Sequence, residues 1–263
     1  MPVNAAPTAE TLMAEMAEIL HARSYDEVWT RLLSTLKLFD ITAVRYGLTR
    51  SRYGYSLGDL QDILYLSSMG DSDFSNYIET GAYRRSPHFR WMAENDGAVS
   101  WGHFVTEWRA GRLEPQELEY MEILEKAGQP AGYLLSFRSD TTRLKGGLGI
   151  MGPRGWDQAR LDAMWDKHGR CIEALCTAAH LNITRMPLPG KEDLLRPRQR
   201  EMLEWIADGK SMQDVAVLTG LSVATVEKHL RGARDRLGVE TTAQAVSKAA
   251  LLGHLFLAEP TGS

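Results

Sequence analysis

The chain has 263 residues, of which 44% are hydrophobic and 24% are charged, and its mean hydropathy is −0.28. This composition excludes collagen-like, low-complexity and disulfide-stapled proteins, and the length predicts about two domains. The formal net charge is −4. A bulk excess of basic residues is therefore not available as an indication of nucleic-acid binding, and any such function has to depend on local charge.

Neither a membrane span nor a secretory signal is indicated. No apolar run approaches the roughly 20 residues of a membrane helix, and the N-terminal segment lacks the basic region of a signal peptide. The two cysteines, Cys171 and Cys176, are five positions apart in one predicted helix, which fits neither a disulfide framework nor a metal knuckle. We therefore expect a cytoplasmic protein with no membrane partner.

A break at residues 184–192 divides the chain. Two prolines and a glycine within four positions cannot continue the helix that precedes them. We expect one domain over residues 1–183, a linker over 184–192 and a second domain over 193–263. Nine Lys or Arg balance nine Asp or Glu in the second domain, so the whole net charge lies in the first part of the chain.

The first domain is predicted to contain both helices and strands. Ser86 and Pro87 fit the N-cap and first position of one of its helices. The order of elements predicts an α+β domain, an α-β-α sandwich in which helices cover an antiparallel sheet. Apolar spacing predicts helices over 12–19, 28–39, 73–82, 87–94, 114–127 and 156–183, and strands over 41–48, 63–66, 132–138 and 147–151.

The second domain is predicted to be all-α. Ser211, Ser222 and Thr242 are the expected N-caps of its later helices, and Gly238 ends the third. A short helix, a glycine-containing turn and a longer helix form a helix-turn-helix signature. Four helices are predicted, over 197–208, 212–218, 223–237 and 243–252.

The third of these helices carries local positive charge. Residues 222–239 hold four basic against two acidic residues inside a neutral domain. Such a helix can enter the major groove, where Arg and Lys donate to guanine and Glu accepts from cytosine. The alternative is a solvated helix face with ordinary charge pairs, and charge alone does not decide between the two.

The residues around this helix closely resemble the LuxR-type helix-turn-helix over about 60 positions. The motifs are Leu195-Arg-Pro-Arg-Gln-Arg-Glu-Met-Leu203, Trp205-Ile-Ala-Asp-Gly-Lys-Ser211, Asp214-Val-Ala216, Leu221-Ser222, Thr225-Val226, His229 and Leu237-Gly-Val239. Gln199 stands where the family usually has a glutamate. The resemblance implies that double-stranded DNA is bound, with Glu227, Lys228 and Arg231 facing bases and Lys210, Ser222, Thr225 and Arg234 contacting phosphates. Because one small domain contacts few phosphates, it also implies a homodimer on a two-fold operator.

Residues 10–183 resemble, more weakly, the sensor domain of quorum-sensing LuxR regulators, which binds an acyl-homoserine lactone between sheet and helices. Tyr77, Ser86-Pro87, Trp101 and Gly132 keep the family's spacing. Asp73 stands at the family's first Trp and Ser86 at its Asp, so two polar contacts to the lactone differ. The resemblance implies a small amphipathic signal, an acyl-homoserine lactone or another molecule, bound by Tyr65, Asp73, Tyr77, Ser86, Trp101 and Gly132.

Aromatic residues are concentrated between positions 46 and 104. Aromatic walls with a few polar groups suit a small amphipathic ligand. For most of these side chains, packing in the core is the alternative.

No motif indicates catalysis. The glycine pattern at residues 147–152 matches a dinucleotide-binding motif in its letters only, because Pro153 follows where a helix would have to begin. The seven histidines show no metal-binding spacing. We expect neither an enzyme nor a bound cofactor or metal.

The sequence thus predicts a transcriptional regulator controlled by a small molecule. Two alternatives remain open. One is a ligand-independent regulator whose pocket is filled by its own side chains, and the other is an anti-regulator that sequesters a related protein as a heterodimer.

Overall fold

The computed structural model describes residues 7–54, 56–58, 60–69, 80–126, 128, 131–188 and 194–256. The chain forms two compact units, Met1–Thr184 (unit 1) and Arg185–Ser263 (unit 2). Most of the predicted helix at 73–82 lies outside the described residues. Its last position belongs to a short 3-10 helix, η3 (Ala82–Arg85).

Unit 1 is built on a five-stranded sheet in which every neighbouring pair is antiparallel. Its spatial order is β2-β1-β5-β4-β3. Gly47 and Gly147 are directly opposite each other in the central pair. The strands are β1 (Ala43–Thr49), β2 (Ile63–Ser67), β3 (Gly97–Ser100), β4 (Gly132–Ser136) and β5 (Lys145–Met151).

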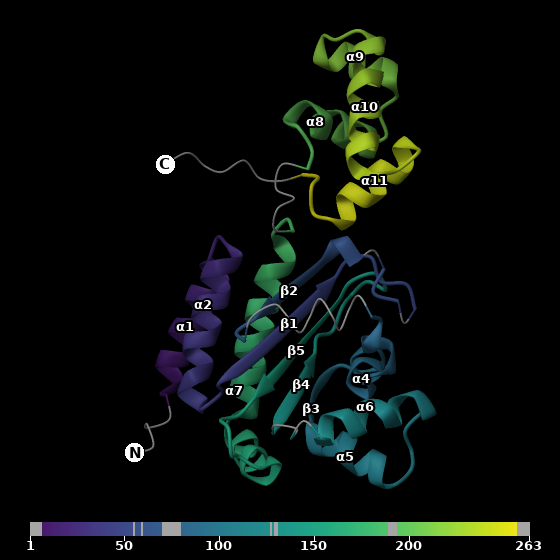
Figure 1. The fold of residues 1–263 in the computed structure, drawn as a ribbon. Helices are drawn as coiled ribbons and strands as arrows, with labels where there is room; N and C mark the ends of the chain where they lie inside the picture. The colour runs from purple at the N-terminus through teal and green to yellow at the C-terminus, as the bar shows by residue number, and fades with distance from the viewer. Residues whose placement is uncertain are drawn as a thin grey trace. The chain divides into compact units, whose positions relative to one another are not determined.

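One face of this sheet is covered by α1 (Ala9–His21), α2 (Tyr25–Leu36) and α7 (Gln158–Arg185) (Figure 1). Side chains alternate between the two faces of a strand. On this side the sheet presents large buried side chains, including Tyr46 and Ile150. Their burial against the helices forms the main core of the unit.

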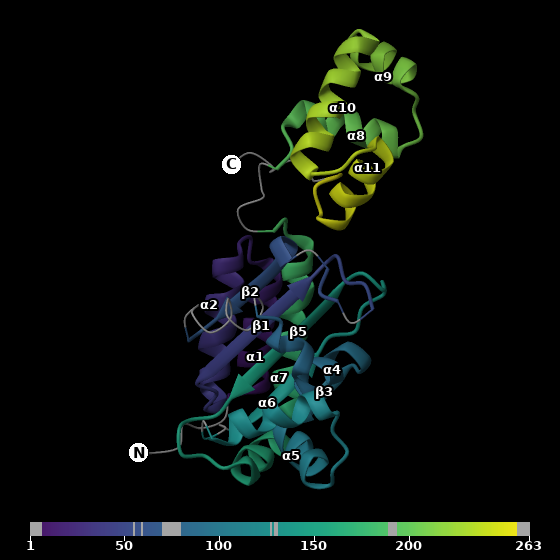
Figure 2. The same cartoon turned by 45° about the vertical axis from the view of Figure 1, so that its right-hand side comes forward.

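The opposite face is covered by α4 (Pro87–Glu94), α5 (Trp101–Arg109) and α6 (Pro115–Lys126) (Figure 2). The predicted α-β-α sandwich with an antiparallel sheet is therefore confirmed. Two elements were missed, β3 and α5. β3 is only four residues long, too short to show an alternating pattern, and α5 has a glycine, a weak helix former, at its second position.

Unit 2 contains the four predicted helices, α8 (Pro197–Ala207), α9 (Met212–Thr219), α10 (Val223–Leu237) and α11 (Thr242–Leu251). The expected all-α helix-turn-helix domain is confirmed. Its core includes the apolar stripe of α10, because Val226, Leu230, Ala233 and Leu237 are all buried.

The helix caps of unit 2 follow the sequence with one correction. Ser211 and Ser222 accept hydrogen bonds from the backbone N–H groups three residues later, as expected of N-caps. Thr242 does not cap α11, because it is the first helical residue and Thr241 is the N-cap. Thr241 Oγ1 accepts from the Gln244 N–H while Gln244 Oε1 accepts from the Thr241 N–H, a reciprocal capping box that fixes the boundary one residue earlier.

Within the described residues, no helix is both long enough and apolar enough to cross a membrane. The two cysteines form no disulfide bond with each other. Cys171 is exposed on α7, and Cys176 is buried on the same helix.

Candidate DNA-binding helix and ligand cavity

The outward surface of α10 carries two cations. Lys228 and Arg231 are exposed, and they are three positions apart, which places them on the same side of the helix. No ion pair involves either side chain within the described part of the chain. Both charges are therefore presented to solvent while the opposite stripe of the helix is buried.

Glu227 and Arg234 are paired with each other. An Arg234 Nη atom lies 2.8 Å from Glu227 Oε1, and another donates to Thr242 Oγ1 at 2.9 Å. This network links α10 to the first turn of α11. Glu227 and Arg234, two of the predicted DNA contacts, thus pair with each other. Lys228 and Arg231 do not take part in this pair.

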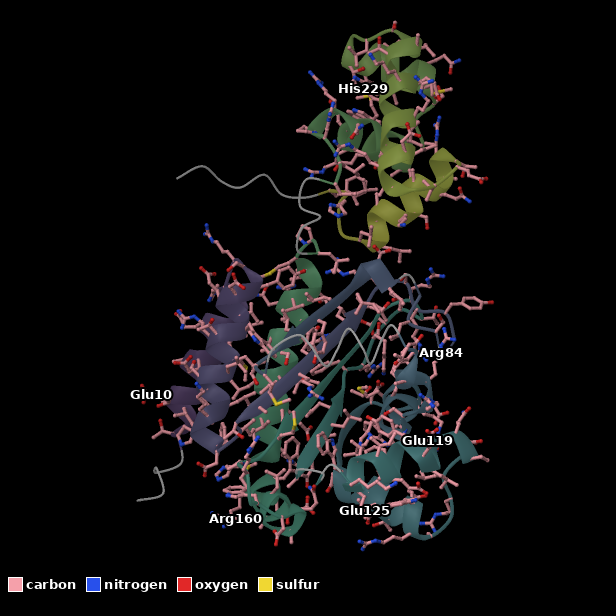
Figure 3. The ribbon with its side chains drawn as sticks, in the orientation of Figure 1. Glu10, Arg84, Glu119, Glu125, Arg160 and His229 are labelled. Carbon is pink, nitrogen blue, oxygen red and sulfur yellow. The ribbon has the colours of Figure 1, made fainter. Side chains whose placement is uncertain are left out.

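The N-terminus of α10 gathers two further predicted residues. Ser222 Oγ accepts from the Thr225 N–H at 3.2 Å and lies 2.9 Å from the Thr225 hydroxyl. Backbone N–H groups at a helix N-terminus favour anions such as phosphate. Lys210 is exposed just before α9, and His229 is half-buried on α10 (Figure 3).

Gln199 has a packing role in α8. Its side chain is buried, and its Oε1 accepts from the Arg196 N–H at 3.0 Å. A Cβ added to Gly232 would lie 2.6 Å from Gln199 Nε2, so the glycine lets α10 approach this amide closely. The uncharged amide of Gln199 accepts this hydrogen bond and packs close to Gly232 without bringing a charge into the interior.

Unit 1 contains a cavity of about 1680 Å³ between the sheet and α4–α6. Part of its floor is the glycine-rich centre of the sheet, at Gly47, Gly147 and Gly149. A Cβ added to Gly47 would meet no atom within 4 Å. The missing side chain of Gly47 thus leaves open space, whereas Met92 occupies the space beside Gly147, where a Cβ would lie 2.3 Å from its sulfur atom.

Aromatic side chains form much of the cavity wall. Two of the predicted ligand contacts, Tyr65 and Trp101, are among the lining residues. Other aromatic residues that line it are Tyr83, Phe89, Tyr120 and Trp156. Such a lining, apolar with a few polar groups, is typical of small-molecule sites.

Trp101 and Gly132 are brought together by the fold. A Cβ on Gly132 would lie 2.5–2.6 Å from three carbon atoms of the indole, so only glycine leaves room for this ring. Gly132 itself is not among the described residues that line the cavity. It acts on the cavity by admitting Trp101.

The other predicted contacts have different placements. Ser86 is 1% exposed, caps α4 by accepting from the Phe89 N–H at 3.4 Å, and is not part of the described cavity wall. Asp73 and Tyr77 lie outside the described residues.

His88 is a cavity residue that the sequence analysis missed. It lies on α4, two positions after Ser86, and its ring centroid is 4.2 Å from that of Phe104 and 5.6 Å from that of Trp101. Burial lowers the pKa of His88 to about 3, so the imidazole is neutral at pH 7. No sequence pattern marks this residue, because the rings around it come from α5 and α6.

A polar network holds α5 against the start of α7. Gln158 Nε2 donates to Ser100 Oγ at 2.9 Å and to Asp162 Oδ1 at 2.8 Å, and Gln158 Oε1 accepts from the Gly132 N–H at 3.0 Å. Ser100 also caps α5 directly before Trp101. The position of the indole is thereby tied to α7.

The described residues hold no group of three or more His, Cys, Asp or Glu side chains placed to bind a metal ion.

Comparison with protein families matches residues 24–183 to the autoinducer binding domain and residues 193–249 to the LuxR family of bacterial regulatory proteins. The chain is 31% identical over 183 residues to the transcriptional activator protein BjaR1 of Bradyrhizobium diazoefficiens, a match that covers 67% of this chain and 69% of BjaR1.

Other matches cover a smaller part of this chain or have a lower sequence identity to it. The quorum-sensing regulator RhlR of Pseudomonas aeruginosa is 31% identical over 84 residues, 32% of this chain, and the match spans only 35% of the length of RhlR. The crystal structure of Escherichia coli SdiA has a TM-score of 0.56 at 13% identity, covering 94% of this chain and 98% of SdiA, which shows a shared fold. A structure of SdiA in complex with octanoyl-rac-glycerol gives a TM-score of 0.54 at 14% identity, covering 94% of this chain and 96% of that one.

Proposed function

The chain belongs to the LuxR family of bacterial regulatory proteins with an autoinducer-binding domain, and on this premise we propose that it is a cytoplasmic transcriptional regulator. Unit 2 binds double-stranded DNA through α10, and unit 1 binds a small molecule in its cavity. The protein acts by binding and not by catalysis. It works as a homodimer on a two-fold operator, because a single small unit contacts too few phosphates for useful affinity.

Two exposed cations on the outer surface of α10, which have no ion pair among the described residues, carry the proposal. Lys228 and Arg231 project from the longer helix of a helix-turn-helix whose opposite stripe is buried. Arg and Lys in the major groove donate to guanine O6 and N7. Glu227, paired with Arg234, shapes the neighbouring surface.

DNA binding by the double variant Lys228→Ala/Arg231→Ala tests the proposal. A target duplex is first selected with the intact chain from a random-sequence library. We expect the variant to bind this duplex at least about 30-fold more weakly, since a base contact of this kind contributes about 1–3 kcal/mol. The measurement is fluorescence anisotropy at fixed salt concentration, with thermal melting to establish that the variant is folded.

A matched control removes the same charge at one position on α8 and one in the last turn of α10. Arg198 pairs with Glu201 on α8, and Arg236 donates to the Leu194 carbonyl. Arg198→Ala/Arg236→Ala should therefore lose only the small nonspecific part of the affinity. Equal losses in the two double variants would show that Lys228 and Arg231 do not read DNA as proposed.

The open cavity favours ligand control over the alternative of a pocket filled by the chain's own side chains. Its volume of about 1680 Å³ exceeds the roughly 300–1,000 Å³ of ordinary ligand sites, so a small amphipathic molecule fits inside it. A ligand that binds one conformation of unit 1 more tightly than another shifts the balance between them. In this proposal that shift is how the signal regulates binding to DNA.

A further inference from the structure

Arg234 holds the side chain of Glu227 in place on one side of α10. Arg234 Nη2 donates to Glu227 Oε1 at 2.8 Å, and Arg234 Nη1 donates to the Thr242 hydroxyl at 2.9 Å. The Arg234 side chain is only 16% exposed, whereas that of Glu227 is 45% exposed. The guanidinium is thus anchored on α11 and bonds a carboxylate that reaches the surface.

This ion pair is not the one that the spacing of charges along α10 favours. A glutamate on a helix ordinarily pairs with a cation four positions later, which for Glu227 is Arg231. Glu227 pairs instead with a residue seven positions later, and Arg231 has no ion pair among the described residues. The planar guanidinium of Arg234 favours this arrangement because it bonds Glu227 and Thr242 at the same time. Arg234 therefore keeps the carboxylate away from Arg231.

The second carboxylate oxygen of Glu227 is available for a contact outside the chain, because Oε2 accepts no hydrogen bond from the described residues. In the major groove a glutamate accepts from the amino group of cytosine, and an arginine donates to O6 and N7 of guanine. A carboxylate near DNA is also repelled by the phosphates, and an adjoining guanidinium offsets this repulsion. The pairing with Arg234 thus suits Glu227 to a contact with a base.

We propose that Arg234 is a positioning residue for base recognition, and that the carboxylate it holds, Glu227, selects cytosine. Glu227 Oε2 accepts from the cytosine amino group, and Arg231 stays available for a guanine nearby. This role replaces the phosphate contact expected for Arg234, because both of its terminal nitrogen atoms are engaged within unit 2. The inference rests on the proposed function, since it takes α10 to be the helix that meets the bases.

Base preference tests the role of Glu227. The duplex selected with the intact chain is changed one base pair at a time, and fluorescence anisotropy measures the affinity for each duplex. The intact chain should prefer cytosine by about fivefold or more at one position of each half-site. Glu227→Gln should lose this preference, because an amide offers a donor as well as an acceptor and matches adenine better. An unchanged preference in Glu227→Gln, or no cytosine preference in the intact chain, would overturn the assignment of Glu227.

A double-mutant cycle tests the role of Arg234. Arg234→Ala releases the carboxylate toward Arg231, so the preferences for cytosine and for the neighbouring guanine should both fall below about twofold. In the Glu227→Gln background the same substitution should change base preference no further. Arg236→Ala is the matched control, because it removes the same charge from the last turn of α10, and it should keep the preferences of the intact chain. A uniform loss of affinity in Arg234→Ala, with base preferences unchanged, would show that Arg234 only joins α10 to α11.

Thr242→Val is decisive if thermal melting shows that Arg234→Ala is not folded. It removes the hydroxyl that anchors Arg234 and keeps both charges of the ion pair, so it should weaken the cytosine preference by about twofold or more. A cytosine preference equal to that of the intact chain would show that the inference is wrong. The two proposals fail separately. Affinity that depends on Lys228 and Arg231, together with base preferences that none of these variants changes, would retain the proposed function and overturn this inference.

Discussion

Glycine has two different effects on the cavity face of the sheet. At Gly47 the absent side chain leaves open space, since a Cβ there would meet no atom within 4 Å. At Gly132 the absent side chain makes room for the Trp101 indole, whose carbon atoms would lie 2.5–2.6 Å from a Cβ. The first glycine enlarges the cavity and the second positions one of its walls.

Alanine at each position should separate these effects. Gly47→Ala should stabilise unit 1 by about 0.5–1 kcal/mol, because it restricts the unfolded chain and creates no clash. Gly132→Ala should destabilise it by about 1–3 kcal/mol, because the indole or the strand has to shift. Urea denaturation of the two variants measures the difference, and equal stabilities would contradict this account of the Trp101 position.

Trp101 and Gly132 show which site residues can be predicted from sequence spacing. Trp101 and Gly132 were singled out by a family pattern, and the structure places them in contact. His88 was not singled out, because its burial arises only when α5 and α6 pack around α4. Ser86 was expected both as a helix cap and as a ligand contact, and the structure shows the cap.

At the scale of elements, two Arg–Glu pairs with the same geometry differ in burial. Arg90 on α4 donates to both carboxylate oxygens of Glu117 on α6, at 2.8 and 2.9 Å, and Glu117 is 1% exposed. Glu117 also accepts from the Glu114 N–H at the start of α6. Arg112 and Glu107 form a similar two-bond pair, but in a more exposed place.

Glu117→Ala should destabilise unit 1 by about 2 kcal/mol, because it leaves a guanidinium and a backbone N–H without their acceptor. The value lies below that for a fully buried pair since Arg90 is 39% exposed. Glu107→Ala is the control and should cause a clearly smaller loss. Thermal melting of both variants makes the comparison, and a larger loss for Glu107→Ala would refute the assignment of the α4–α6 contact.

Elements with strong local signals were predicted well. Pro87 after a capping serine predicted the bounds of α4 as observed. Glycine-containing turns followed by capping serines predicted where the helices α9 and α10 of unit 2 begin. β3 was not predicted from the sequence, because its four residues adopt the strand conformation by pairing with β4, 33 or more positions away in the chain. Glu119 and Glu125, labelled in Figure 3, are exposed on α6, and such charged positions weaken the apolar pattern of the helix without preventing its packing.

At the scale of the whole molecule, the stability of unit 1 depends on two neutral imidazoles buried on opposite faces of one sheet. His180 on α7 lies 2.8 Å from the Tyr46 hydroxyl and stacks on Phe137. Burial, together with the positive charge of Lys145, lowers the pKa of His180 to about 4. His88 on the cavity face has a pKa of about 3 because it is buried.

Acid should therefore destabilise unit 1 before its carboxylates are protonated. An imidazole in the unfolded chain takes up a proton near pH 6.5, whereas these two resist protonation until the pH falls to about 4 and 3. Below pH 6.5 the unfolded chain thus binds more protons than the folded chain, and stability decreases as the pH decreases. From pH 7 to pH 5 each histidine should account for a loss of about 2 kcal/mol.

Urea denaturation at pH 5, 6, 7 and 8 measures this dependence. Stability should be nearly flat between pH 7 and 8, where both states hold neutral imidazoles, and should fall steeply below pH 6.5. His88→Phe removes one of the two groups and should roughly halve the slope between pH 7 and 5, whatever its effect on stability at pH 7. A slope that is unchanged in this variant would mean that His88 is protonated in the folded chain, which contradicts its burial among aromatic rings.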